Sequence, residues 1–262
     1  MPDGTIEALY RYPVKGLTPE RLARTRLAVG ETIPGDRRYA VENGPSGFDP
    51  AAPAYLAKTH FLMLMRNERL ARLDARYDDA SHVLTLRHEG REVARGDLST
   101  PEGRRAIEDF FARYSADELR GAPRLLAAEG HSFSDVARKV VSIINLASVA
   151  AIETAVGAPV HPLRFRGNLY LAGWPAWREF DLVERELAVG REARLKVVKR
   201  IVRCAATNVD PDTGMRDLAL PKSLMQSFGH MDCGVYAEVM TGGEIAAGDS
   251  ISVVPERAAL GV

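Results

Sequence analysis

Apolar and polar residues alternate along much of this chain, which is the pattern of half-buried β-strands. In the first half the alternation covers residues 6–12, 24–29 and 70–78. In the second half, apolar runs at residues 140–144 and 193–202 indicate further strands. Because these runs are short and are separated by turn-forming residues, the pattern predicts a β-rich protein.

Local signals add a hairpin and a helix to the predicted strands. Glu89 and Gly90 separate two strand-like runs, which is typical of a β-hairpin. Residues 99–102 combine hydroxyl side chains, a proline and an early acid, so a helix should begin there. With many strands and few helices, we predict an α+β, β-rich barrel fold. We place a domain boundary near residue 120, which divides the chain into residues 1–120 and 121–262.

Composition narrows the class of protein but leaves its chemistry open. The chain has 262 residues, of which 46% are hydrophobic and 27% are charged, as in ordinary globular proteins. Its 35 basic and 35 acidic residues balance, which argues against nucleic-acid or anionic membrane partners. We see no signal peptide and no apolar run long enough to span a bilayer. The expectation is a cytoplasmic protein with reduced thiols.

The segment around Cys204 is the first candidate for chemistry. Arg203 and Cys204 follow a predicted strand, and a turn-rich loop with Asp210 and Asp212 comes next. Cations favour the reactive thiolate form of cysteine, and a soft metal would accept such a sulfur ligand. The alternative is a small buried side chain at the end of a strand, which is the common role of free cysteines. Cys233, the second cysteine, has the same two interpretations.

Two further places could bind an anion. The predicted strand-to-helix junction at residues 145–148, with Ser148 as a helix cap, would present unpaired N–H groups. Arg164 and Arg166 are two residues apart, so on a strand they would share one face. Beside Gly167 this pair could clamp a phosphate, and a salt-bridged strand edge is the alternative.

Several separated motifs occur in a set order along nearly the whole chain. They are Tyr12-Pro13-Val14-Lys15-Gly16, Gly35-Asp36-Arg37-Arg38-Tyr39-Ala40-Val41, Arg164-Phe165-Arg166-Gly167-Asn168, Arg203-Cys204 with Asp210-Pro211-Asp212-Thr213-Gly214, and Gly234-Val235-Tyr236 with Gly248-Asp249. This set resembles the MOSC family, the domain named for the C-terminus of molybdenum cofactor sulfurase, preceded by its N-terminal β-barrel-like domain. Within the family, the chain is similar to the mitochondrial amidoxime-reducing component and to bacterial reductases of N-hydroxylated bases.

The resemblance implies a MOSC β-barrel fold and a molybdenum–molybdopterin cofactor. Cys204 matches the cysteine that supplies the thiolate ligand of the metal. Asp210 matches an acidic position beside the metal, where it would orient substrate or relay protons. The other matched positions contact the cofactor: Lys15, Arg37, Asn145, Ser148, Arg166, Asn168 and Arg203. For the family as a whole, pyridoxal phosphate binding is a further implication.

The implied activity is reduction of small N-hydroxylated or N-oxygenated compounds. The sequence has no ferredoxin-like cysteine cluster, so we expect a separate electron-donor protein. The alternative is a non-catalytic protein that carries molybdenum cofactor, or that carries sulfur on Cys204. Two departures are Gly16, where the amidoxime reducer has serine, and Gly167, which replaces a proline and should loosen the strand. The cofactor assignment requires Lys15, Arg37 and Arg166 to converge on the cleft that holds the Cys204 sulfur.

Overall fold

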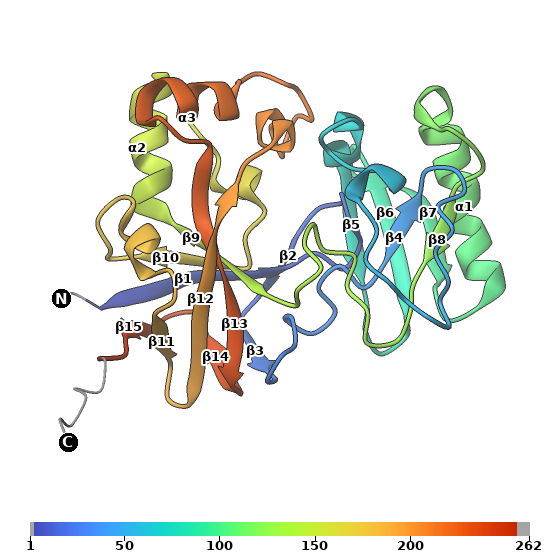
Figure 1. The fold of residues 1–262 in the computed structure, drawn as a ribbon. Coiled ribbons are helices and arrows are strands. Elements are labelled where there is room, and N and C mark those ends of the chain that lie inside the picture. Colours follow the sequence, from blue (N-terminus) through green and yellow to red (C-terminus); the bar gives the residue numbers. More distant parts are fainter. Residues whose placement is uncertain (1–2, 256–262) are drawn as a thin grey trace.

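A closed barrel of seven strands forms the larger lobe of the protein in this computed structural model, which describes residues 3–255 (Figure 1). The strand order is β10-β9-β13-β12-β11-β15-β1, and pairing of β1 with β10 closes the barrel. The strands are β1 (Gly4–Arg11), β9 (Val141–Asn145), β10 (Leu169–Ala172), β11 (Glu186–Val189), β12 (Ala193–Val202), β13 (Asp232–Thr241) and β15 (Ser250–Val253). The prediction of an α+β, β-rich barrel is confirmed.

The first half of the chain contributes directly to this barrel. Strand β1 pairs with β10 and β15, and the last residues of β1 also pair with β2 (Glu20–Leu22). Strand β3 (Arg24–Leu27) pairs with β14 (Gly243–Ala246) from near the other end of the chain. The barrel therefore includes strands from both predicted segments. The boundary at residue 120 stays a prediction about folding units.

The smaller lobe is a three-stranded antiparallel sheet covered by a helix. It contains β5 (Leu73–Tyr77), β6 (Val83–His88), β7 (Arg91–Asp97) and α1 (Pro101–Tyr114). The hairpin and the helix start were predicted correctly, and Thr100 accepts a hydrogen bond from the Gly103 N–H as the cap of α1. A Cβ atom on Gly96 would lie 2.1 Å from the Gly103 carbonyl oxygen, so α1 can pack directly on β7.

A short two-stranded pairing and several 3₁₀ helices complete the fold. Strand β4 (Ala40–Glu42) pairs with β8 (Arg124–Leu126). The predicted strand over residues 70–78 begins only at Leu73, because a 3₁₀ helix precedes it. The 3₁₀ helices are η1 (Lys58–His60), η2 (Glu68–Arg72), η3 (Ala116–Glu118), η4 (Pro162–Phe165), η5 (Arg178–Leu182) and η6 (Ala205–Asn208).

The remaining helices, α2 (Leu146–Val156) and α3 (Leu220–Phe228), lie together at one end of the barrel (Figure 1). Asn145 caps α2 by accepting a hydrogen bond from the Ala147 N–H. The prediction that Ser148 is the cap is therefore wrong, since Ser148 lies in the first turn of the helix. Within residues 3–255, no helix combines the length and the apolar character needed to cross a membrane.

Candidate functional site

A cavity of about 320 Å³ is lined by residues of both halves of the chain. Its walls come from the loops after β1, from the loop before β9, from the segment that joins η4 to β10, and from the end of β12. Six of the residues predicted from the sequence line it: Lys15, Arg37, Arg166, Asn168, Arg203 and Cys204. The required convergence of Lys15, Arg37 and Arg166 with Cys204 is thus present in the structure.

Cys204 is held at the end of β12 by main-chain hydrogen bonds. The Arg203 N–H donates to the Met231 carbonyl oxygen at 2.8 Å, which keeps the chain in register after the strand ends. The Cys204 carbonyl oxygen accepts from the N–H and the hydroxyl of Thr207, as η6 begins. The Cys204 side chain is left half-buried in the cavity wall, where a ligand can reach its sulfur.

The nearest charged partner of the Cys204 sulfur is Lys58. Its Nζ lies 3.3 Å from Cys204 Sγ and 3.6 Å from the Asp135 carboxylate. Lys58 was missed from the sequence because it lies in none of the motifs that indicated the other candidate residues. No motif spacing relates it to Cys204, since the contact depends on how the two lobes meet.

Asp135 also binds the second lysine of the cavity. Lys15 forms an ion pair with Asp135 and donates to the Phe133 carbonyl oxygen at 2.9 Å. Burial lowers the pKa of Lys15, and Asp135 only partly offsets that effect. Burial alone would raise the pKa of Asp135, but the ammonium groups of Lys15 and Lys58 lower it to about 2. Asp135 therefore stays ionised between two lysines.

Arg203, next to Cys204, is buried and its guanidinium group donates to main-chain carbonyl oxygens. It donates to the Cys233 carbonyl oxygen, and to the Phe165 carbonyl oxygen at 2.7 Å. Gly234 lets the backbone approach, because a Cβ atom there would lie 2.4 Å from the Ile143 carbonyl oxygen. Cys233 itself is fully buried, and burial raises the pKa of its thiol to about 12. These features favour the structural interpretation of Cys233.

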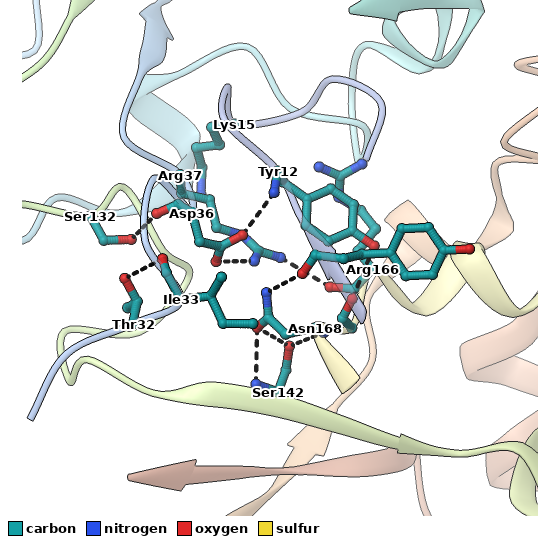
Figure 2. A network of polar contacts seen from close by, with 12 residues as sticks. Tyr12, Lys15, Thr32, Ile33, Asp36, Arg37, Ser132, Ser142, Arg166 and Asn168 are labelled. Carbon is teal, nitrogen blue, oxygen red and sulfur yellow. Dashed lines mark hydrogen bonds and ion pairs between the residues drawn. The ribbon is translucent and has the colours of Figure 1, made fainter. Parts of the chain in front are cut away.

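Arg37 and Arg166 lie against the ring of Tyr12 (Figure 2). Arg37 forms an ion pair with Asp36, and its Nη2 donates to the Arg166 carbonyl oxygen at 3.0 Å. Arg166 donates to the Leu17 carbonyl oxygen at 2.8 Å. Burial and the neighbouring charge of Arg37 lower the pKa of Arg166. The cavity wall thus holds two close cations of which only Arg37 has a bonded carboxylate.

The prediction that Arg164 and Arg166 share one face of a strand is wrong. Arg164 lies in η4, and Arg166 follows it in the left-handed region with φ +50°. Arg164 also lines the cavity, but its guanidinium group bonds Asp210 at 2.9 Å and Asp217 at 2.7 Å. Only Arg166 joins the cluster around Tyr12.

Asp210 organises the loop that follows Cys204. Its Oδ1 accepts hydrogen bonds from the Asp212 and Thr213 N–H groups, and its Oδ2 accepts from Arg164. Burial raises the pKa of Asp210, but the bonds from Thr213 outweigh this and lower it overall. Asp210 is not among the residues that line the cavity. Its catalytic role stays a prediction of the family resemblance.

Asn145 and Ser148 lie away from the cavity, around the buried carboxylate of Glu179. Asn145 Nδ2 donates to Glu179 at 2.9 Å, and the Ser148 hydroxyl donates to it at 2.8 Å. Burial raises the pKa of Glu179, while these two donors oppose the rise. The structure therefore gives Asn145 and Ser148 roles in joining α2 to η5, and does not bring them to the predicted cofactor cavity.

Asn168 reaches the cavity, but its amide is engaged in supporting bonds. Its Oδ1 accepts from the Ser142 N–H and hydroxyl, and its Nδ2 donates to the Tyr10 carbonyl oxygen at 3.1 Å. Next to it, Gly167 packs tightly, because a Cβ atom there would lie 2.3 Å from Ile144 Cγ1. The expected looseness at Gly167 is thus wrong, and the absent side chain permits close packing.

The charges around the cavity are unbalanced. Eight basic side chains line it, but only the two carboxylates Asp36 and Asp135 do so. Met63 and Leu64 supply an apolar wall. Within residues 3–255 no three His, Cys, Asp or Glu side chains are clustered as a metal site. A cavity with this charge excess and one accessible thiol suits an anionic ligand that also presents a thiol-binding group.

Comparison with protein families covers most of the chain. Residues 3–119 match the model described as the MOSC N-terminal beta barrel domain, and residues 128–252 match the MOSC domain. The mitochondrial amidoxime reducing component 2 of Bos taurus is 30% identical over 123 residues, and the Rattus norvegicus protein is 29% identical. These matches cover 42% of this chain and 36% of the length of each relative.

Two solved structures resemble the chain at lower sequence identity than these relatives. YuaD from Bacillus subtilis is 14% identical with a TM-score of 0.46, over 96% of this chain and 95% of that protein. YiiM from Geobacillus stearothermophilus is 22% identical with a TM-score of 0.35, over 44% of this chain and 54% of that protein. The two family matches carry the assignment: the chain belongs to the MOSC family, with the N-terminal beta barrel domain preceding the MOSC domain.

Proposed function

We propose that this protein is a molybdenum cofactor-dependent reductase of N-hydroxylated or N-oxygenated compounds, with Cys204 as the protein ligand of the metal. The observation that carries the proposal is the convergence of the Cys204 thiol with Lys15, Arg37 and Arg166 on one cavity. The partial similarity to amidoxime reducing components supports the reaction class. Because that similarity covers only part of those relatives, the substrate class is inferred for this chain.

The residues present fit a cofactor that carries both a phosphate and a thiolate-binding metal. Arg166 is a half-buried cation that bonds the Leu17 carbonyl oxygen and, within residues 3–255, forms no ion pair with a carboxylate, as expected for a side chain that binds an anion. Lys15 and Arg37 would bind the same anionic ligand from the opposite half of the chain. When bound, the cofactor supplies two-electron redox chemistry, which the protein side chains cannot perform.

Lys58 gives the cavity a hydrogen-bond donor beside the sulfur. Its ammonium already donates to Cys204 Sγ and can donate to a polar ligand that enters there. Lys58 and Asp135 together place an ammonium group and a negative charge next to the cavity. Met63 and Leu64 are buried and give the cavity an apolar part of its wall.

The overall reaction consumes two electrons and two protons, and it converts an N-hydroxylated compound to the reduced nitrogen compound and water. We propose that a separate donor protein provides the electrons. Pyridoxal phosphate binding stays a prediction of the family resemblance alone.

A reductant-driven assay tests this proposal. Purified protein with its cofactor should reduce benzamidoxime to benzamidine in the presence of a chemical electron donor. Cys204→Ser should remain folded and lose this activity. Full activity of Cys204→Ser would refute the role of the thiol. Molybdenum bound in stoichiometric amount without any turnover would favour the alternative, a non-catalytic cofactor carrier.

A further inference from the structure

Tyr12 joins the two chain segments that carry Arg37 and Arg166. The Arg37 N–H donates to the Tyr12 carbonyl oxygen at 2.7 Å, and the Tyr12 N–H donates to Asp36 at 2.8 Å. The Tyr12 hydroxyl donates to the Gly167 carbonyl oxygen at 3.2 Å. Tyr12 is therefore bonded to Arg37 and its neighbour Asp36 in one segment, and to Gly167, the neighbour of Arg166, in the other.

The ring of Tyr12 also contacts both guanidinium groups. Its centroid lies 4.5 Å from Arg37 Cζ and 4.3 Å from Arg166 Cζ, and Figure 2 shows the ring between the two side chains. Tyr12 is completely buried and both arginines are half-buried, and cation–π contacts strengthen as water is excluded. They hold two like charges at a fixed separation.

The backbone of both arginines is strained in the same way. Arg37 has φ +51° and Arg166 has φ +50°, in the left-handed region that non-glycine residues seldom occupy. Such conformations persist only where the surroundings impose them, and they gather at ligand sites. The two segments share the bonds from Tyr12 and one direct bond, from Arg37 Nη2 to the Arg166 carbonyl oxygen.

We propose that Tyr12 is a positioning residue that sets the spacing of the Arg37 and Arg166 cations, so that together they bind the phosphate monoester of the ligand. This inference rests on the proposed function only in assuming that the cavity binds a phosphate. Without the ring, only the bonds to Asp36, to Leu17 and to the Arg166 carbonyl oxygen hold the two guanidinium groups, and their repulsion favours a wider separation. A bound anion relieves the repulsion, so phosphate should stabilise the folded protein.

The test measures binding of inorganic phosphate to cofactor-free protein by calorimetry and by thermal unfolding. Tyr12→Leu keeps an apolar side chain but removes the ring, and should raise the Kd for phosphate at least about tenfold. Tyr12→Phe keeps the ring and should stay within about threefold of the wild type, because it loses only the hydroxyl bonds to the Gly167 carbonyl oxygen and to the Tyr170 side chain. Molybdenum content after expression with ample cofactor should fall in the same order.

Two further variants separate positioning from folding. Tyr77→Leu removes another buried tyrosine, in the sheet of the other lobe, and should lower stability without changing phosphate affinity. Replacement of Tyr12 by pentafluorophenylalanine keeps the shape but reverses the ring charge distribution, and should weaken phosphate binding relative to Phe. This second comparison decides the question if Tyr12→Leu does not fold.

Three results would overturn the proposal. One is a folded Tyr12→Leu variant that binds phosphate as tightly as the wild type. Another is a pentafluorophenylalanine variant that matches Tyr12→Phe. Either would remove the role of Tyr12 and leave the proposed function standing. Absence of phosphate binding by the wild type would instead overturn the phosphate site itself, together with this inference.

Discussion

Lys58 Nζ lies 3.3 Å from Cys204 Sγ, although 146 residues separate the two in the sequence. The contact joins the first half of the chain to the end of the barrel strand β12. It places a half-exposed ammonium group beside the proposed metal ligand. Lys58 is therefore a candidate for binding ligands beside the Cys204 sulfur, and it is not one of the residues that the family resemblance indicated.

Replacing Lys58 should impair turnover if its ammonium acts on ligands beside the sulfur. We expect Lys58→Met to lower kcat on an N-oxygenated substrate roughly tenfold or more, because a charge-assisted hydrogen bond is lost. Lys58→Arg should recover part of the rate. The exposed Lys222 on α3 provides a control, and Lys222→Met should behave as the wild type. Equal rates for Lys58→Met and Lys222→Met would contradict the role.

Asp210 should prove to be a structural residue. Asp210→Asn weakens the pairing with Arg164, whose side chain is only 1% exposed, and should cost about 1–3 kcal/mol of unfolding free energy. The exposed Asp212 is the control, and Asp212→Asn should cost much less. Urea unfolding and steady-state kinetics measure both effects. If Asp210→Asn abolishes kcat at unchanged stability, Asp210 acts in the chemistry, as the resemblance implies.

Ser148 should contribute to stability and not to ligand affinity. Ser148→Ala removes one of the donors to the buried Glu179 carboxylate, which should cost about 1–3 kcal/mol. The Kd for phosphate should not change, because Ser148 lies away from the cavity. Thermal unfolding and calorimetry on the same variant check both statements. A loss of phosphate affinity with little loss of stability would instead place Ser148 in the anion site.

The pairing of Asp135 with two lysines predicts a pH-dependent contribution to stability. The pKa of Asp135 is lowered to about 2, below the roughly 3.9 of an unfolded aspartate. The stabilisation is therefore complete above about pH 4 and is lost as the pH falls toward 2. Its size should be modest, because the side chain is 46% exposed and water screens the charges.

Comparison of the wild type with Asp135→Asn tests this linkage. The variant should be less stable at pH 7, the difference should stay constant down to about pH 4, and it should then shrink as the pH is lowered from 4 toward 2. Urea unfolding at several pH values gives the measurement. A difference that stays constant over this range would show that the carboxylate charge does not carry the stabilisation.

The sequence was sufficient for most of the fold, because the relevant signals are local. The hairpin around Gly90 and the helix start at Thr100 depend on neighbouring residues, and both are present. The segment around Arg164 and Arg166 was misjudged as a strand, because η4 and the left-handed Arg166 depend on tertiary contacts with Asp210 and Tyr12. Local spacing could not reveal those partners.

The candidate site could be predicted only in part, for a related reason. Motif resemblance found Lys15, Arg37 and Arg166, which lie in recognisable local sequences. It missed Lys58 and Asp135, whose positions depend on how separate loops meet at Cys204. It also assigned Asn145 and Ser148 to the cofactor, whereas their polar atoms satisfy the buried Glu179. A polar residue at a helix start serves either purpose, and only the fold distinguishes them.

The most direct test of the account is X-ray absorption spectroscopy at the molybdenum edge on protein purified with its cofactor. The account predicts stoichiometric molybdenum in the wild type, with the Cys204 sulfur among its ligands. Cys204→Ser should show one sulfur fewer around the metal and, as the structural role of the thiol is small, an unchanged fold. A molybdenum environment that is identical in the two proteins, or the absence of molybdenum from the wild type after expression with ample cofactor, would contradict the account.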